Sequence, residues 1–131
     1  MSVSQEADKF NSDVDSWDVS RVTNMDALFA NQGSFNADIS DWDTSSVTSM
    51  QIMFHSASEF NQQLNWETSG VTSMFAMFYE ATAFNQDLSA WDISGVTNMI
   101  RMFSGATSFN QQLGWDTSDA STANMFHGTP V

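Results

Sequence analysis

The chain has 131 residues, and 16 acidic side chains stand against three Lys and Arg, giving a formal net charge of −13 at pH 7. So negative a surface repels the phosphates of nucleic acids and of anionic membranes, so neither is an expected partner. The chain has no cysteine, which excludes disulfides and thiolate metal sites. Its polar N-terminus predicts no signal peptide, and no stretch is apolar for long enough to predict membrane insertion.

Two aromatic positions recur along the chain at intervals of 24 or 25 residues. The recurring residues are Phe10, Phe35, Phe60, Phe84 and Phe109, and Trp17, Trp42, Trp66, Trp91 and Trp115. A period of this length is typical of stacked repeat proteins. We therefore expect one domain over residues 1–131, in which 1–9 form a lead-in or cap, 10–126 form five repeats and 127–131 form a C-terminal tail.

The second half of each repeat has the apolar spacing of a short helix. Met50, Met53, Phe54 and Ala57 fall at positions i, i+3, i+4 and i+7, which is one face of a helix of about two turns. The pattern returns at Met25, Leu28 and Phe29, at Met74, Met77, Phe78 and Ala81, and at Met99, Met102, Phe103 and Ala106. A threonine precedes each segment as the predicted N-cap: Thr23, Thr48, Thr72 and Thr97. Asp26 and Gln51 are candidate capping-box partners.

The first half of each repeat predicts one or two short strands, because aliphatic residues alternate there with polar ones. The two aliphatic columns are Val14, Ile39, Leu64, Leu88 and Leu113, and Val22, Val47, Val71 and Val96. An asparagine follows each opening Phe and is expected to bond the turn backbone and the stacked asparagines. The last repeat is irregular and lacks one residue before Met125, so we expect both ends of the stack to be partly uncovered.

A carboxylate follows every tryptophan, which places five acidic side chains in one column. They are Asp18, Asp43, Glu67, Asp92 and Asp116. Stacking would bring them about 4.8 Å apart, so their repulsion must be compensated. One interpretation is calcium binding, since calcium prefers several oxygen ligands. The alternative is that each carboxylate accepts hydrogen bonds from the backbone or from the serine two residues on.

The sequence gives little indication of catalysis, and we expect no enzyme and no resident cofactor. The two histidines, His55 and His127, stand at a variable position and at the irregular end. The variable positions of the predicted helices are more informative, because they carry aromatic and aliphatic side chains where polar ones are expected. These residues form a candidate contact site for a protein partner or for self-association: Ile52, His55, Phe75, Tyr79, Ile100 and Arg101.

The stretch from Phe84 to Ser108, FNQDLSAWDISGVTNMIRMFSGATS, resembles the BspA-like leucine-rich-repeat variant, whose DUF285-type repeat has about 25 residues. Such repeats occur in surface lipoproteins of mycoplasmas and in surface proteins of other bacteria. The resemblance implies an α/β, right-handed leucine-rich-repeat-like solenoid of about five units, each with a short strand and a short helix. It also implies a non-enzymatic adhesion module at the cell surface or secreted, although the chain shows no targeting signal. A calcium-dependent structural array is the alternative.

Overall fold

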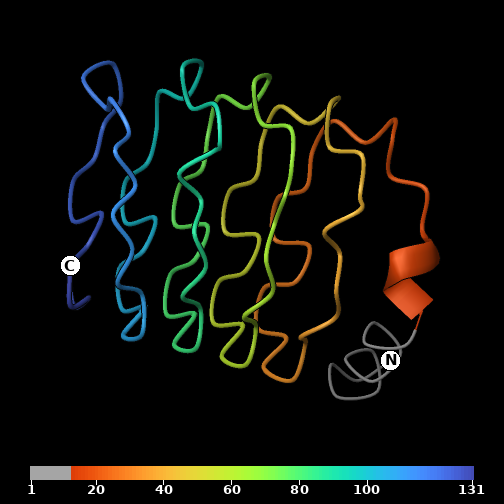
Figure 1. Ribbon diagram of the computed structural model, residues 1–131, viewed down its shortest axis with the longest axis horizontal. Helices are drawn as coiled ribbons and strands as arrows, with labels where there is room; N and C mark the ends of the chain where they lie inside the picture. Colours follow the sequence, from red (N-terminus) through yellow and green to blue (C-terminus); the bar gives the residue numbers. More distant parts are fainter. Residues whose placement is uncertain (1–12) are drawn as a thin grey trace.

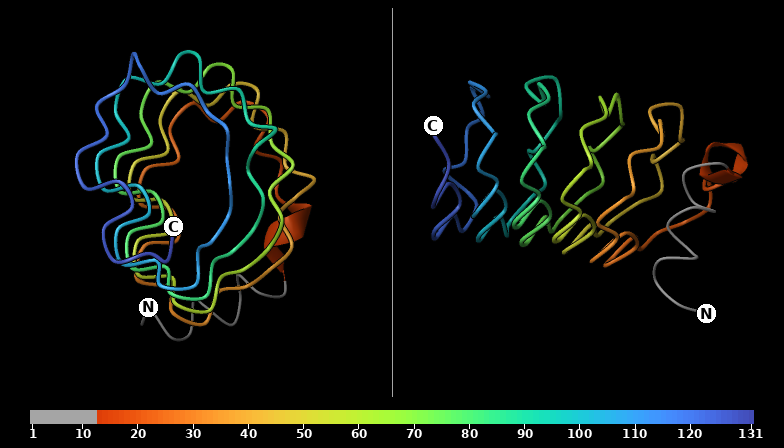
Figure 2. Two further views of the ribbon diagram at one scale, coloured as in Figure 1. Left: turned by 60° about the vertical axis from the view of Figure 1, so that its left-hand side comes forward. Right: turned by 90° about the horizontal axis from the view of Figure 1, so that it is seen from below.

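The computed structural model describes residues 13–131, so the predictions on residues 1–9, Phe10 and Asn11 lie outside the described part. Within it, successive repeats form coils that lie side by side along the longest axis of the molecule (Figure 1). Seen nearly end-on, the coils follow one another around a common interior (Figure 2). Consecutive repeats in sequence are therefore also neighbours in space.

The prediction of an α/β solenoid built from helix-plus-strand units is wrong. The only helical element in residues 13–131 is the 3-10 helix η1 (Val14–Ser16), and no helix there is long and apolar enough to span a membrane. Regular strand pairing in the same described range is limited to isolated parallel bridges that join one residue of each repeat to the next: Asn24, Ser49, Ser73, Asn98 and Ser121. Each repeat is instead a series of tight turns.

The predicted helices are absent because two backbone positions in each segment are left-handed. In the second repeat they are Ile52, with φ 49°, and Ser56, with φ 57°. An α-helix requires right-handed residues throughout. The backbone N–H groups of Met50, Ile52, Phe54 and Ser56 accordingly donate to carbonyls of the following repeat, whereas Met53, His55 and Ala57 donate within tight turns. The same alternation recurs in the neighbouring repeats.

The residues predicted to form the apolar face are nevertheless buried. Met50, Met53, Phe54 and Ala57 are completely buried, as are their counterparts in the two following repeats. A run of turns that points every third or fourth side chain inward thus reproduces the spacing of a helix. The burial prediction is confirmed, although the conformation that was expected to produce it is wrong.

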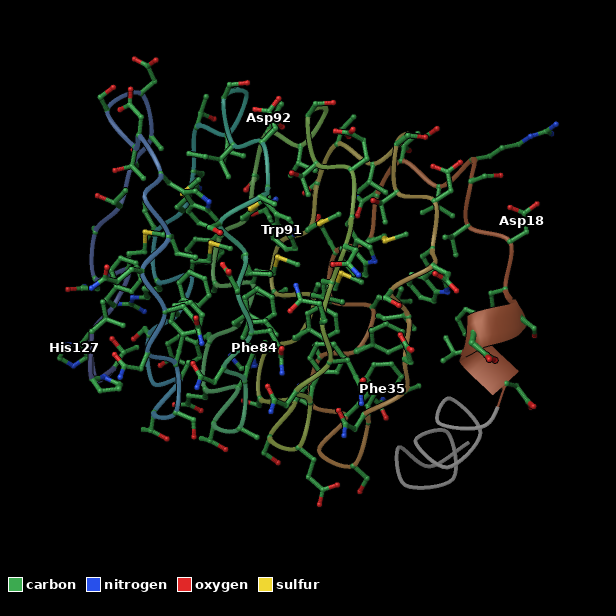
Figure 3. All side chains as sticks on the ribbon, in the orientation of Figure 1. Asp18, Phe35, Phe84, Trp91, Asp92 and His127 are labelled. Carbon is green, nitrogen blue, oxygen red and sulfur yellow. The ribbon has the colours of Figure 1, made fainter. Side chains whose placement is uncertain are left out.

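Aromatic columns fill the interior, where Phe35, Phe84 and Trp91 point inward (Figure 3). Phe54 stacks on Phe78 at 5.4 Å and Phe78 on Phe103 at 5.5 Å, while each of these rings also lies against a second Phe column at 4.1 Å. The indoles of Trp42, Trp66 and Trp91 stack at 6.2 Å. Like side chains therefore pack against one another from repeat to repeat, which stabilises turns that would not persist alone in water.

Polar side chains form a second set of columns that satisfies the backbone. The Asn36 side-chain oxygen accepts the Asn61 N–H at 2.9 Å, and Asn61 and Asn85 repeat this contact with the next asparagine. The expected asparagine ladder is therefore confirmed. The threonines predicted as helix caps have a different role, because the hydroxyls of Thr48, Thr72 and Thr97 each donate to the backbone carbonyl of the preceding threonine.

The left-handed positions give a testable prediction on stability. Gly105 occupies one of them, with φ 74°, and an added Cβ would lie 3.0 Å from Cγ of Glu80. We expect Gly105→Ala to lower the free energy of unfolding by about 1–2 kcal/mol, because an L-residue resists this conformation and the added Cβ would also press on the Glu80 side chain. Gly114→Ala is the control, since Gly114 has φ 66° and no atom within 4 Å. Urea unfolding should show the larger loss for Gly105→Ala, and equal losses would mean that contact with Glu80 has no effect.

Candidate protein-contact site

Five of the six residues predicted as a contact site surround one hollow on the side of the stack. Ile52, His55, Phe75, Tyr79 and Arg101, together with Ala76, line a shallow space of about 240 Å³. Ile100, the sixth predicted residue, does not line it. We use the name lateral patch for the six predicted residues, Ile52, His55, Phe75, Tyr79, Ile100 and Arg101. They lie on turns of three successive repeats, not on helices.

The lateral patch consists mainly of half-buried side chains. Arg101 is exposed, whereas the other five residues are partly covered. The rings of His55 and Tyr79 stack at 4.9 Å with an interplanar angle of 9°. Apolar and aromatic surface is therefore presented next to one of the three cationic side chains of a chain whose net charge is −13. Surfaces that combine aromatic rings with an arginine are typical of the centres of protein interfaces.

A second hollow continues the first toward the C-terminal end, and the sequence did not reveal it. It has about 220 Å³ and is lined by Tyr79, Arg101, Ser104, Asn124 and His127. Because Tyr79 and Arg101 line both hollows, the two spaces adjoin. Figure 3 shows His127 on the outermost coil. The missing residue of the last repeat disguised the register of His127. His127 stands two residues after Met125, as Tyr79 stands two residues after Met77, which places it in the column of His55 and Tyr79.

The residues of the acidic column lie on the outside of the coils, where Figure 3 shows Asp18 and Asp92. Each carboxylate accepts the backbone N–H of the serine two residues on, at 2.9–3.0 Å. In the first two repeats, the hydroxyls of Ser20 and Ser45 also donate to Asp18 and Asp43 at 2.6 Å. The alternative reading of this column, local bonding to serine, is therefore confirmed for all five residues.

These contacts give no geometric support to calcium binding. Nowhere in residues 13–131 do three His, Cys, Asp or Glu side chains meet in a group that could hold a metal ion. The calcium hypothesis remains a prediction, which melting curves in calcium and in a chelator test directly. We expect equal melting temperatures because each carboxylate is bonded within its own turn. A higher melting temperature in calcium would support the hypothesis instead.

The serine bonds also make stability depend on pH. The Ser45 hydroxyl and then the Ser45 N–H lower the pKa of Asp43. For Glu67 the Ser69 N–H is the larger cause of the lowered pKa. The pKa is lowered in the same way at Asp18, Asp38, Asp87, Asp92 and Asp116. A group whose pKa is depressed by folding contributes stability above its unfolded pKa and loses that contribution as pH falls through the folded pKa.

We therefore expect the urea midpoint to fall as the pH is lowered below about 4, where unfolded carboxyl groups begin to bind protons. Ser45→Ala is the matched variant, since it removes the hydroxyl that holds Asp43 and should make this acid dependence shallower. The measurement is urea unfolding at a series of pH values. A midpoint that stays constant or rises on acidification would show that relief of charge repulsion outweighs the serine bonds.

Comparison with known proteins assigns a family to the chain but gives it no activity. The model of the family described as "Mycoplasma protein of unknown function, DUF285" matches residues 1–113 and, in a second overlapping match, residues 64–130. Overlapping matches are expected of an internally repeated chain, because one set of repeats aligns in more than one register. No curated protein and no solved structure matches the chain. Since the match spans nearly the whole chain, the protein belongs to the mycoplasma family DUF285.

Proposed function

We propose that this protein is a non-enzymatic interaction module whose lateral patch binds a protein partner. The observation that carries the proposal is the gathering of Ile52, His55, Phe75, Tyr79 and Arg101 around one hollow. These residues come from three repeats, so the surface exists only when the repeats are stacked. Since the interior is filled by its own aromatic columns, a partner has access to the outside of the coils and not to the core.

The backbone beneath the hollow adds a second argument. Ile52, Ala76 and Arg101 are all left-handed, with φ of 49°, 49° and 58°. This conformation is rare for a β-branched residue and costs of the order of 1–3 kcal/mol when a side chain other than Gly adopts it. Asparagine, which tolerates it better, occupies the same position only in the last repeat, as Asn124 with φ 55°. Because Ala27 has the same conformation in the first repeat, with φ 60°, the left-handed position belongs to the repeat itself. What distinguishes the hollow is that a β-branched Ile52 and a long Arg101 are retained at this position.

The resemblance to BspA-like repeats supports, as part of this proposal, a role in a surface or adhesion system. BspA-like leucine-rich-repeat proteins and mycoplasma lipoproteins display such repeats outside the cell, so the proposed location is the cell surface or the extracellular space. An acidic exterior suits a display protein, because a large net charge keeps it soluble and disfavours nonspecific association with nucleic acids and anionic lipids.

Replacing both Phe75 and Tyr79 with serine tests the lateral patch. Both side chains are partly exposed, so the near-UV circular dichroism of the stacked tryptophans should persist. Immobilised wild-type protein should retain partners from an extract of cell-surface proteins, and the double variant should lose them. Asn65→Ser is the control, because Asn65 is exposed and lies outside the lateral patch, so this variant should retain partners like the wild type. Identical retention by wild-type protein and a folded double variant would refute the proposal.

A further inference from the structure

We infer that the two ends of the stack bind each other in different copies of the chain, so that the protein associates head to tail. In this association the last repeat of one copy lies against the first described repeat of the next. The inference concerns the ends of the stack, whereas the proposed function concerns its side. It would hold even if the lateral patch had no partner.

The backbone ladder between repeats has a direction. In the segment after each bridge residue, the N–H groups of one repeat donate to carbonyls of the following repeat. Met74, Ala76, Phe78 and Glu80 thus donate to Asn98, Ile100, Met102 and Ser104 at 2.8–2.9 Å. The next repeat donates in the same way to Ser121, Ala123, Met125 and His127 at 2.8–3.0 Å. In this segment, every boundary between repeats in the described chain therefore has its donors on the earlier repeat and its acceptors on the later one. The N–H groups of Thr48, Thr72, Thr97 and Ser121 run the other way, each to the threonine carbonyl of the preceding repeat at 2.7–2.9 Å.

This direction leaves complementary groups at the two ends. The N–H groups that would continue the ladder belong to Thr122, Asn124, Phe126 and Gly128, and no acceptor reaches them among residues 13–131. The corresponding carbonyls of the first described repeat belong to Asn24, Asp26, Leu28 and Ala30, which receive no donor in the same part of the chain. Within each set, the four groups belong to every second residue, and the two sets occupy equivalent positions of the repeat. Within residues 13–131, four donors without an acceptor at one end thus match four acceptors without a donor at the other.

The side chains at the two ends are uncovered in a corresponding way. A hollow of about 510 Å³ at the last repeat is lined by Leu113, Trp115 and Phe126, among others. A hollow of about 420 Å³ at the first is lined by Val22 and Leu28, among others. Inside the stack, the equivalent Leu88 is 1% exposed, Phe103 is 0% and Val96 is 2%. A neighbouring repeat is therefore what normally covers these positions.

A second copy is the occupant that fits both ends at once. Open ladder groups are a template for pairing with another chain. The partner must supply acceptors to one end and donors to the other at the spacing of this backbone, as each repeat already does for its neighbour. Because the two surfaces differ, the contact is heterologous and leads to open assemblies rather than to a closed dimer.

Light scattering of the full chain tests the association first. The weight-average mass should rise with protein concentration without reaching a plateau at a dimer. Added salt should increase it further, because it screens the repulsion between copies that each carry a net charge of −13. A mass equal to one chain at every concentration and salt level would overturn the inference.

Two single variants then test the polarity of the contact. Val22→Lys places a charge on the first described repeat, and Leu113→Lys places one on the last. Each variant keeps one competent end, so each alone should have the mass of a single chain, whereas an equimolar mixture should form a complex with twice that mass. Asn65→Lys is the control with the same charge change on the exposed side of the stack, and it should associate like the wild type.

The other outcomes contradict head-to-tail contact. If Leu113→Lys alone forms dimers, the first repeats bind each other symmetrically. Association of both end variants at the wild-type level would place the contact on the side of the stack. Near-UV circular dichroism checks that each variant is folded. If either variant fails this check, Leu28→Lys and Phe126→Lys probe the same two ends.

Discussion

Phe78→Ala should lower the free energy of unfolding by about 3–5 kcal/mol, the loss typical of removing a fully buried ring. Phe78 is completely buried and stacks on three other rings, Phe54 at 5.4 Å, Phe84 at 4.1 Å and Phe103 at 5.5 Å. Truncation leaves a cavity in the middle of the stack, where neighbouring repeats on both sides prevent collapse. Urea unfolding followed by tryptophan fluorescence measures the change.

Phe126→Ala is the matched control, since Phe126 ends the same column. It is only half buried, and the one ring it is seen to stack on in residues 13–131 is Phe103, at 5.5 Å. Its loss of stability should therefore be clearly smaller than that of Phe78→Ala. Equal losses would show that the contribution of a ring to stability does not depend on having neighbours on both sides.

Trp66→Ala is expected to have an effect of similar size, about 3–5 kcal/mol. Trp66 is 5% exposed and stacks on Trp42 and Trp91 at 6.2 Å. Its Nε1–H also donates to the Ile39 carbonyl at 3.0 Å, which lies in the preceding repeat. The indole thus joins two repeats both by packing and by a hydrogen bond.

Trp66→Phe separates these two contributions. It keeps an aromatic ring in the column but removes the N–H, so we expect a loss of about 1–3 kcal/mol. The Ile39 carbonyl retains the backbone N–H of Trp42 at 3.2 Å, which limits the penalty. Calorimetry or urea unfolding of both variants measures the difference. If Trp66→Phe is as unstable as Trp66→Ala, the hydrogen bond outweighs the stacking.

The sequence was sufficient to predict the stacking of repeats and the identity of the core, because both depend on which side chains recur. Met53, Phe54 and Trp66 stand at positions that are apolar in successive repeats, and all three are buried. The asparagine ladder was predictable for the same reason, since a polar residue that recurs next to the core must satisfy backbone groups.

The local conformation was not predictable, because the left-handed positions carry misleading residues. Ile52 and Arg101 are poor indicators of a left-handed backbone, although both adopt it. The residues that indicate a left-handed backbone are Asn124 in the first left-handed column, and Asn31, Gly105 and Gly128 in the second, which they share with Ser56 and Glu80. Apolar spacing alone cannot distinguish a two-turn helix from turns of the same length.

The candidate site was predictable in its members but not in its extent. Residues of the predicted helix face, such as Phe75 and Tyr79, still meet, because residues that share a column in the repeat remain neighbours in either conformation. His127 was missed because the shortened last repeat obscured its column. Ile100 was included because it shares a column with Phe75, but the turn places it outside the hollow.

The equivalence of the boundaries between repeats has a consequence for how such genes change. Since each repeat contacts only its neighbours, the free energy of unfolding of the stack is close to the sum of the contributions of the single repeats and of the interfaces between them. Duplication or deletion of a complete unit by recombination recreates a boundary of the existing kind, so the length of the protein can change without any compensating substitution. Variation in the number of units among relatives is therefore expected to be tolerated far better than insertion of a few residues within one.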